Sequence, residues 1–376
     1  MRLSFFGMIG PNVKLATSLY SLFTSHGILQ GVFLNDSTPV SHLIQTERLR
    51  HHQRFGNNYL PGFPHQGVAN TAVLSVYDKD YALFERDQPY EISISYPSVH
   101  TLSKVRTPYT ISAHSTFSPP FIHSMTYSIL HRTVSFLTLT STFQPHRIHT
   151  VRTTYLPLVH DFIRHQHTHV FTESPVHLSL VHFPAYLHPH QPTYIHVLPH
   201  KYTSPTSFFI FHYADFSENE TAYTLYAPAY DTLSFRDVNI SGKYRKFILD
   251  KSTRQIIIEK NPLLESYNLD FPVKWGRRIL LRNLCKDHIN GFVLCDGLTI
   301  VRTYWVNVSV LGEPYIHNDT LYCFATDVHT YLLCIDLPSG NQTLTLLDLP
   351  GTLGFHSFAK FETDTVNPIQ TPDLHN

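Results

Sequence analysis

Short runs of alternating apolar and polar residues, separated by turn residues, recur along most of the chain and constrain the fold more than any other feature. Thr71–Val76, Thr133–Leu139 and Tyr331–Leu337 are examples, and turns such as Ser118-Pro119-Pro120 lie between runs. Similar runs are Tyr90–Tyr96, His177–His182, Phe208–His212, Arg254–Glu259, Leu298–Val301 and Thr343–Leu349. Because successive side chains of a strand point to opposite faces of a sheet, this alternation predicts strands. Aromatic residues, at 13%, also favour strands, so we expect an all-β protein.

Two N-terminal segments need separate interpretation. Asn12–Thr24 has helical spacing, with Leu15, Leu19, Leu22 and Phe23 on one face. The first residues resemble a weak signal peptide, but their apolar stretch is only about eight residues, so we interpret them as a strand. No run approaches the roughly 18 apolar residues that a membrane-spanning helix needs. We expect a soluble, cytoplasmic protein, with peripheral membrane contact as an option.

The length of 376 residues fits one large β architecture, and a pair of sandwiches, a barrel or a propeller remain open. Seven units would have about 54 residues each, enough for a four-stranded blade of about 40–45 residues with its loops. No clean repeat of that period is present. Composition alone therefore does not select the propeller.

Charge and cysteine content exclude several classes of protein. Lys+Arg and Asp+Glu both number 28, so there is no basic excess for a nucleic-acid partner. The cysteines, at positions 285, 295, 323 and 334, form no Cys-x-x-Cys pair, which argues against a zinc knuckle or a redox motif. Reduced thiols packed in strands are the expectation.

Single histidines carry little information in a chain that has 27 of them. His165, His167 and His169 alternate along a segment, Phe162–Phe171, that we predict to be one strand. These three, the pair His51-His52, and His188 with His190 are best interpreted as solvated surface histidines.

Four histidines differ from the others in their neighbours and in their order along the chain. They lie in the motifs Ser112-Ala113-His114, Leu158-Val159-His160-Asp161-Phe162, Phe209-Ile210-Phe211-His212 and Gly354-Phe355-His356-Ser357. Acids lie in further motifs, Tyr81-Ala82-Leu83-Phe84-Glu85, Leu269-Asp270-Phe271-Pro272 and Gly312-Glu313-Pro314. Together with Ile9-Gly10-Pro11-Asn12 and Asn70-Thr71, this ordered set resembles the motifs of the carotenoid cleavage oxygenase family.

The resemblance covers nearly the whole chain and implies a fold. It implies a single domain over residues 1–376, a seven-bladed β-propeller with a loop cap over one face. The histidine spacings of 46, 52 and 144 residues agree with this, since such distant residues converge only if their units surround a common axis. The chain is shorter than most members of the family, so substrate-tunnel loops and an apolar membrane patch are expected to be trimmed.

The resemblance also implies a metal site. One Fe(II) would be held by four imidazoles, those of His114, His160, His212 and His356. Carboxylates would stand behind three of them, Glu85 behind His160, Asp270 behind His212 and Glu313 behind His356, and His114 would have none. Metal-bound histidines usually donate their second ring N–H to such a carboxylate. Asp270 replaces the family's glutamate, and restoring Glu there is expected to be neutral or slightly favourable.

Three functions stay open at this point. The leading one is cleavage of a carotenoid or apocarotenoid double bond by Fe(II) and O2, by a monomer in which no side chain acts directly as acid or base. The second is cleavage of a phenolic stilbene. In stilbene-cleaving members a lysine grips the phenol where this chain has Phe84, so Phe84 predicts a substrate pocket without a cation and favours the apolar polyene. The third is a catalytically silent propeller that serves as a binding module.

Overall fold

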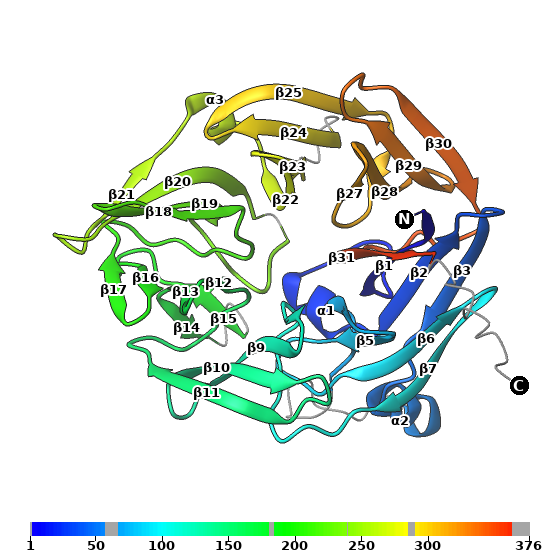
Figure 1. Cartoon of the computed structure of the whole chain (residues 1–376), viewed down its shortest axis with the longest axis horizontal. Helices are drawn as coiled ribbons and strands as arrows, with labels where there is room; N and C mark the ends of the chain where they lie inside the picture. Colours follow the sequence, from blue (N-terminus) through cyan, green and yellow to red (C-terminus); the bar gives the residue numbers. More distant parts are fainter. Residues whose placement is uncertain (1, 57–66, 180–183, 239, 285–289, 363–376) are drawn as a thin grey trace, which may run out of the picture.

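Strands dominate the computed structural model, which describes residues 2–56, 67–179, 184–238, 240–284 and 290–362. They form seven antiparallel sheets of four or more strands, which stand side by side around a central axis (Figure 1). One further two-stranded ribbon pairs β14 (Val176–Leu178) with β15 (Ala185–Leu187). The architecture is a seven-bladed β-propeller, as the motifs implied.

Each blade runs outward from an axis-facing strand. The first blade has, in this direction, β31 (His356–Phe361), β1 (Leu3–Pro11), β2 (Gly27–Phe33) and β3 (Thr38–Leu43), and the second has β4 (Ala72–Val76), β5 (Lys79–Leu83), β6 (Tyr90–Ser95) and β7 (Ser98–Lys104). The third has β8 (Thr116–Ser118), β9 (Phe121–Ser128), β10 (Thr133–Thr140) and β11 (Pro145–Arg152), and the fourth has β12 (Ile163–His165), β13 (Thr168–Glu173), β16 (Tyr194–Val197) and β17 (His200–Thr203). The fifth has β18 (Asp215–Glu218), β19 (Ala222–Tyr230), β20 (Gly242–Asp250) and β21 (Ile256–Glu259), and the sixth has β22 (Leu269–Trp275), β23 (Arg278–Asn283), β24 (Asn290–Asp296) and β25 (Thr299–Val306). The seventh has β26 (Ser309–Val310), β27 (Tyr315–His317), β28 (Thr320–Thr326), β29 (Thr330–Asp336) and β30 (Gln342–Leu347).

The ring is closed by strands from the two ends of the chain. β31 pairs with β1, so that His356 lies opposite Ile9 in the register. Buried Gln30 of β2 ties the chain before β31 to the same blade, because its amide donates to Thr352 Oγ1 at 2.7 Å and accepts from the Gly351 N–H at 2.9 Å. Closure packs the first blade against both the second and the seventh, so that the apolar blade faces that an open array would expose at its ends are buried.

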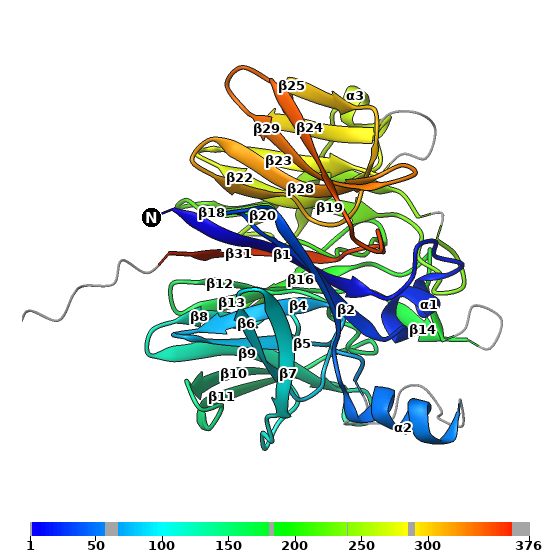
Figure 2. The ribbon, with the colours of Figure 1, turned by 90° about the vertical axis from the view of Figure 1, so that its right-hand side faces the viewer.

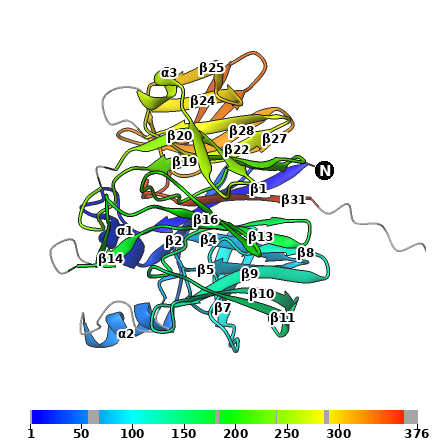
Figure 3. The same cartoon turned by 90° about the vertical axis from the view of Figure 1, so that its left-hand side faces the viewer.

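Helices are short and lie at one face of the ring. Ser18 caps α1 (Leu19–Thr24) by accepting a hydrogen bond from the Ser21 N–H, so the helix is shorter than the predicted Asn12–Thr24. We did not predict α2 (Glu47–Phe55), because it buries only Leu49 and therefore has no apolar stripe. α3 (Pro262–Glu265) is a single turn. Figures 2 and 3 show α1, α2 and β14 at the same face, which is thus covered by helices as well as by loops.

Most of the predicted runs are strands, with ends shifted by one or two residues. Two predictions are wrong. Phe162–Phe171 is a β12–β13 hairpin that turns at Gln166 (φ 50°), so His165, His167 and His169 do not share one face. Phe208–His212 makes only an isolated bridge, from Phe209 to Tyr230, because its apolar side chains are buried between blades rather than in a sheet. Of the run His177–His182, β14 covers the beginning, and residues 180–183 lie outside the described part.

The core lies between neighbouring blades. Between the sixth and seventh blades, for example, Leu280 and Leu294 pack against Leu321 and Leu333, all of them buried. Three cysteines, Cys295, Cys323 and Cys334, are free thiols in β24, β28 and β29, as expected, and Cys285 lies outside the described residues. No helix among the described residues has the length and apolar character to cross a membrane.

Because β31 closes the ring, removing its apolar contact with β1 is predicted to lower the free energy of unfolding. Phe358 is 6% exposed, and its ring centroid lies 5.9 Å from that of Phe5. Phe358→Ala should lower the free energy of unfolding by about 3 kcal/mol, the usual cost of removing a buried Phe side chain, as measured by urea denaturation. Leu344→Ala on the outer strand β30, where Leu344 is 47% exposed, is the matched control and should change it by about 0.5 kcal/mol or less. Equal losses in both variants would contradict a closure that depends on this contact.

Candidate metal centre

The four histidines of the motifs lie at the inner ends of four different blades. His114, His160 and His212 come two or three residues before β8, β12 and β18, which are axis-facing strands, and His356 opens β31. Each side chain is therefore positioned where the chain enters its blade from the axis. This shared location explains how residues so far apart in sequence converge.

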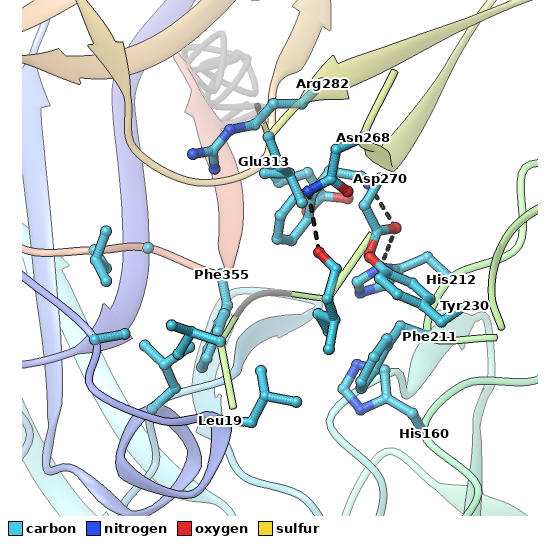
Figure 4. Close-up of a pocket in the computed structure, with 18 of the residues that line it drawn as sticks. Leu19, His160, Phe211, His212, Tyr230, Asn268, Asp270, Arg282, Glu313 and Phe355 are labelled. Carbon is cyan, nitrogen blue, oxygen red and sulfur yellow. Dashed lines mark hydrogen bonds and ion pairs between the residues drawn. The ribbon is translucent and has the colours of Figure 1, made fainter. Parts of the chain in front are cut away.

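Three of these imidazoles form a compact cluster. Nε2 of His114 lies 2.9 Å from Nε2 of His160, and the ring centroid of His212 lies 5.3 Å and 5.2 Å from those of His114 and His160. One nitrogen from each ring lies within 4.8 Å of the others. Figure 4 shows His160 and His212 on the same side of the cavity, on either side of Phe211. Such a group can hold one metal ion.

His356 borders the same cavity but is not part of that compact cluster. Its Nδ1 accepts a hydrogen bond from the Val73 N–H at 3.4 Å, and its Nε2 lies 4.0 Å from Oε2 of Glu313. The His356 ring thus turns Nε2 toward a carboxylate, whereas the other three rings present Nδ1 to theirs. It stays a candidate fourth ligand.

Carboxylates stand behind the clustered rings. His212 Nδ1 donates to Asp270 Oδ1 at 2.8 Å. Oε1 of Glu85 lies 2.9 Å from His160 Nδ1, although the angle is outside that of a hydrogen bond. No carboxylate accepts a hydrogen bond from His114 among the described residues, although Oδ1 of Asp161 lies 3.9 Å from its Nδ1. Asp161 was visible in the His160 motif, but without the fold nothing connected it to His114.

Each of the three acids of the motifs has a neighbour with positive φ. Arg86 follows Glu85 with φ 51°, Phe271 follows Asp270 with φ 52°, and Gly312 precedes Glu313 with φ 119°. A β-bulge between Asp270 and Val273 lies at the second of these positive-φ residues, Phe271. Strained backbone and bulges are concentrated at functional sites, where they direct a side chain away from the regular ladder.

Burial and mutual charge set the pKa values of these groups. Burial and the neighbouring imidazoles hold the pKa of His114 well below its usual value. Burial also raises the pKa of Asp161 to about 6 and that of Glu313 to about 7. Burial acts to lower the pKa of His212, but the Asp270 carboxylate outweighs it, with help from Asp161 and Glu313, and raises the pKa to about 9. In the metal-free site, a proton on His212 therefore offsets part of the negative charge of the carboxylates. A bound metal ion would displace this proton.

Asp270 is held by hydrogen bonds at both of its carboxylate oxygens. Its Oδ1 accepts from His212 and from the Phe271 N–H, both at 2.8 Å, and its Oδ2 accepts from the Tyr230 hydroxyl. Asp270 is 3% exposed. A longer acid at this position would have to displace His212 or give up one of these hydrogen bonds, so we now expect Glu to weaken the site.

A cavity of about 520 Å³ adjoins the cluster (Figure 4). This volume is typical of pockets that enclose small organic ligands. Most of its wall is apolar, including Leu19, Leu22, Phe23, Phe211, Phe271 and Phe355. His114, His160, His212 and His356 lie in the same wall. An apolar ligand in this cavity would contact the cluster directly.

The expected role of Phe84 does not agree with this cavity, since Phe84 does not line it. The segment after β5 approaches the cluster from behind His160, through the Glu85 carboxylate. A cation that we did not predict nevertheless borders the cavity: Arg282, from β23, is part of its wall and lies opposite Asp270 in the β22–β23 register. Strand periodicity alone could not reveal this, because it requires the pairing register of the two strands.

The histidine-rich segments lie outside the cluster, as expected. His165 approaches Glu218, with 3.9 Å between Nε2 and Oε2, and His52 in α2 pairs with His26, with 3.0 Å between ring nitrogens. Among the described residues, only His114, His160 and His212 form a group of three potential metal ligands.

The donor set fits a divalent transition metal. Imidazole nitrogens suit Fe, Zn, Cu and Ni, and carboxylates behind the rings fix the tautomer and increase ligand basicity. The Nε2 atoms of His114 and His160 face each other at 2.9 Å, which is favourable only with a proton or a cation between them. The acids nearby supply the negative charge that offsets such a cation.

Comparison with known proteins agrees with this geometry. The model of the family described as "Retinal pigment epithelial membrane protein" matches residues 6–281. The chain belongs to this family, the carotenoid oxygenases, whose members are metal-dependent dioxygenases. A search of curated protein sequences finds no significant match.

Solved structures share the fold at low sequence identity. A variant of the Synechocystis apocarotenoid oxygenase is 17% identical with a TM-score of 0.74, covering 95% of this chain and 92% of the other. The cobalt-substituted form of that enzyme gives the same values. The lignostilbene dioxygenase of Pseudomonas brassicacearum is 14% identical with a TM-score of 0.77, covering 96% and 92%. At these identities the likeness concerns the fold.

The cluster predicts which histidines are needed for metal. His114→Ala, His160→Ala and His212→Ala should each lose most of the bound metal, because each removes one of three converging nitrogens, and metal content by elemental analysis measures this. The triple variant of His165, His167 and His169 to Ala is the control, and its metal content should equal that of the unmodified protein. Full metal occupancy in a double variant of His160 and His212 would contradict the assignment.

The packing around Asp270 makes a second prediction. Asp270→Glu should weaken metal binding by about tenfold, the lower end of losses seen when an outer carboxylate is disturbed, because the extra methylene displaces His212. Asp270→Asn, of equal size, separates the effect of charge from that of length. Titration with Co(II) followed by its absorption spectrum gives both affinities. An unchanged affinity in Asp270→Glu would show that the site has room for the longer acid.

Proposed function

We propose that the protein is a non-haem Fe(II) dioxygenase that cleaves one double bond of a carotenoid or apocarotenoid with O2, giving two carbonyl products. One observation carries the proposal: three imidazoles with carboxylates close behind them meet in the wall of a largely apolar cavity. Membership of a dioxygenase family supports the reaction class. The structural relative from Synechocystis is, by its name, an apocarotenoid oxygenase.

The iron would be held by His114, His160 and His212, with His356 as the fourth ligand. Iron held by these residues would supply the binding and activation of O2. Asp270 accepts the hydrogen bond from Nδ1 of His212, which leaves Nε2 of that ring for a metal, and Glu85 lies 2.9 Å from Nδ1 of His160, where its charge favours a proton on that nitrogen.

The cavity wall would bind the polyene and exclude water. Phe23 stacks on Phe355, with 5.6 Å between ring centroids, and lies 6.5 Å from Phe211. Burial of polyene surface against these rings contributes about 25 cal/mol per Å². No side chain acts as a direct acid or base in this scheme. The protein contributes by placing one double bond beside the metal and by keeping it dry.

Cleavage of a phenolic stilbene is the second candidate, and one observation favours it. Arg282 places a cation in the cavity wall, so the argument against a phenolate that rested on Phe84 no longer holds. The lignostilbene dioxygenase is also among the structural relatives. A catalytically silent propeller that binds an apolar ligand is the third.

Product analysis distinguishes the three candidates. Fe(II)-loaded protein is incubated in air with an apocarotenal, a carotenoid and a hydroxystilbene, and products are identified by mass spectrometry. We expect carbonyl fragments from the carotenoid or apocarotenal, and none without O2 or with His160→Ala. Cleaved stilbene beside intact polyenes would support the second candidate. No product from any substrate, with iron bound, would support the silent propeller.

A further inference from the structure

Arg282 is a partly buried cation whose hydrogen bonds are incomplete. Its Nη1 donates to the Gly312 carbonyl oxygen at 2.9 Å, and its Nη2 donates to that of Val310. Nε is buried and has no partner. A guanidinium has five N–H donors, so three of them lack an acceptor among the described residues. Burial lowers the pKa of Arg282.

No described carboxylate forms an ion pair with this guanidinium. Asp270, its cross-strand neighbour, already accepts from His212 and Tyr230 and acts on Arg282 only through space. Phe271 covers the guanidinium on one side, with 5.5 Å from the Arg282 Cζ to the ring centroid. A buried charge without a partner is unfavourable unless something else satisfies it.

Two other polar side chains near Arg282, those of Asn268 and Tyr230, have hydrogen-bond partners. The Asn268 amide donates to the Ile240 carbonyl oxygen at 3.1 Å and accepts from the Gly242 N–H at 2.8 Å. The Tyr230 hydroxyl is bonded to Asp270. Among the described residues of the cavity wall, Arg282 is the one arginine or lysine, and it has donors to spare. It is therefore the group in the wall that is best suited to bind a ligand oxygen.

We propose that Arg282 binds the carboxylate of a polyene acid, so that the cavity takes apolar chains with an anionic end. A planar guanidinium matches a carboxylate in shape and charge, and hydrogen bonds between them are stronger than neutral ones. The apolar wall then holds the chain. This inference rests on the proposed function for the nature of the chain, but the carboxylate subsite is a binding property that is measured without turnover.

The location of Arg282 determines how a bound polyene acid would lie in the cavity. Figure 4 places Arg282 and His160 at opposite ends of the residues drawn, with Asp270 between them. A ligand fixed by its carboxylate at Arg282 extends toward the histidine cluster from a defined starting point. The distance along the chain from the carboxylate then determines which double bond lies beside the metal.

The test compares retinoic acid with its methyl ester, which has the same polyene without the charge. Binding to the metal-loaded protein is followed without O2 by quenching of tryptophan fluorescence. The acid should bind about tenfold tighter than the ester, the effect of one hydrogen bond to a charged group. Arg282→Met should remove this preference and leave ester binding within about twofold. Arg278→Met, on the same strand with its guanidinium over Trp275, is the matched control and should keep the preference.

Two further measurements distinguish a carboxylate subsite at Arg282 from binding of the acid to the metal and from a purely structural arginine. Metal-free protein should keep the preference for the acid, and its loss there would show that the carboxylate binds the metal instead. Arg282→Lys keeps the charge and should retain part of the preference even if Arg282→Met fails to fold.

Equal binding of acid and ester by the unmodified protein, or an unchanged preference in Arg282→Met, would overturn the proposal. If Arg282 serves only to hold the chain at Gly312, Arg282→Met loses metal or stability while acid and ester still differ. Failure of the proposed cleavage reaction leaves this binding difference intact.

Discussion

The imidazoles and carboxylates at the propeller axis must have their charges balanced, and this requirement determines what the site can bind. Two imidazole nitrogens, Nε2 of His114 and of His160, face each other at 2.9 Å, and partly buried carboxylates lie behind them. Imidazoles and carboxylates removed from water are costly unless each finds a partner. A divalent cation bound between the rings satisfies the nitrogens and offsets the acids together. The metal-free protein achieves this only partly, with a proton on His212 that the Asp270 carboxylate stabilises.

The propeller creates this concentration of polar groups by bringing the inner ends of its blades together. Each blade contributes one axis-facing strand, and His114, His160 and His212 lie just before three of these strands, where they converge. The backbone departs from regular geometry beside Glu85, Asp270 and Glu313, where positive φ values redirect the chain. Because β31 closes the ring against β1, the placement of His356 depends on both ends of the chain. Stability of the fold and assembly of the site are thus coupled.

Much of the fold and part of the site could be predicted from the sequence, for physical reasons. Alternating runs predicted the strands because one face of each is buried, and the motifs around the histidines implied the propeller. Local patterns failed where tertiary structure decides. Phe162–Phe171 folds back at Gln166, Asp161 faces His114 only in the folded ring, and Arg282 reaches the cavity through its pairing with Asp270. Phe84 does not line the cavity, because a matching position in a motif does not fix which side chains do.

The most direct test of the metal centre is a crystal structure of the iron-loaded protein with anomalous scattering data collected on both sides of the iron absorption edge. We expect one anomalous peak on the propeller axis, bonded to Nε2 of His114, His160 and His212. We also expect the His356 ring to turn and join them. An iron peak elsewhere, or an axis without one in protein that contains iron by elemental analysis, would contradict the claim that these imidazoles form the metal centre.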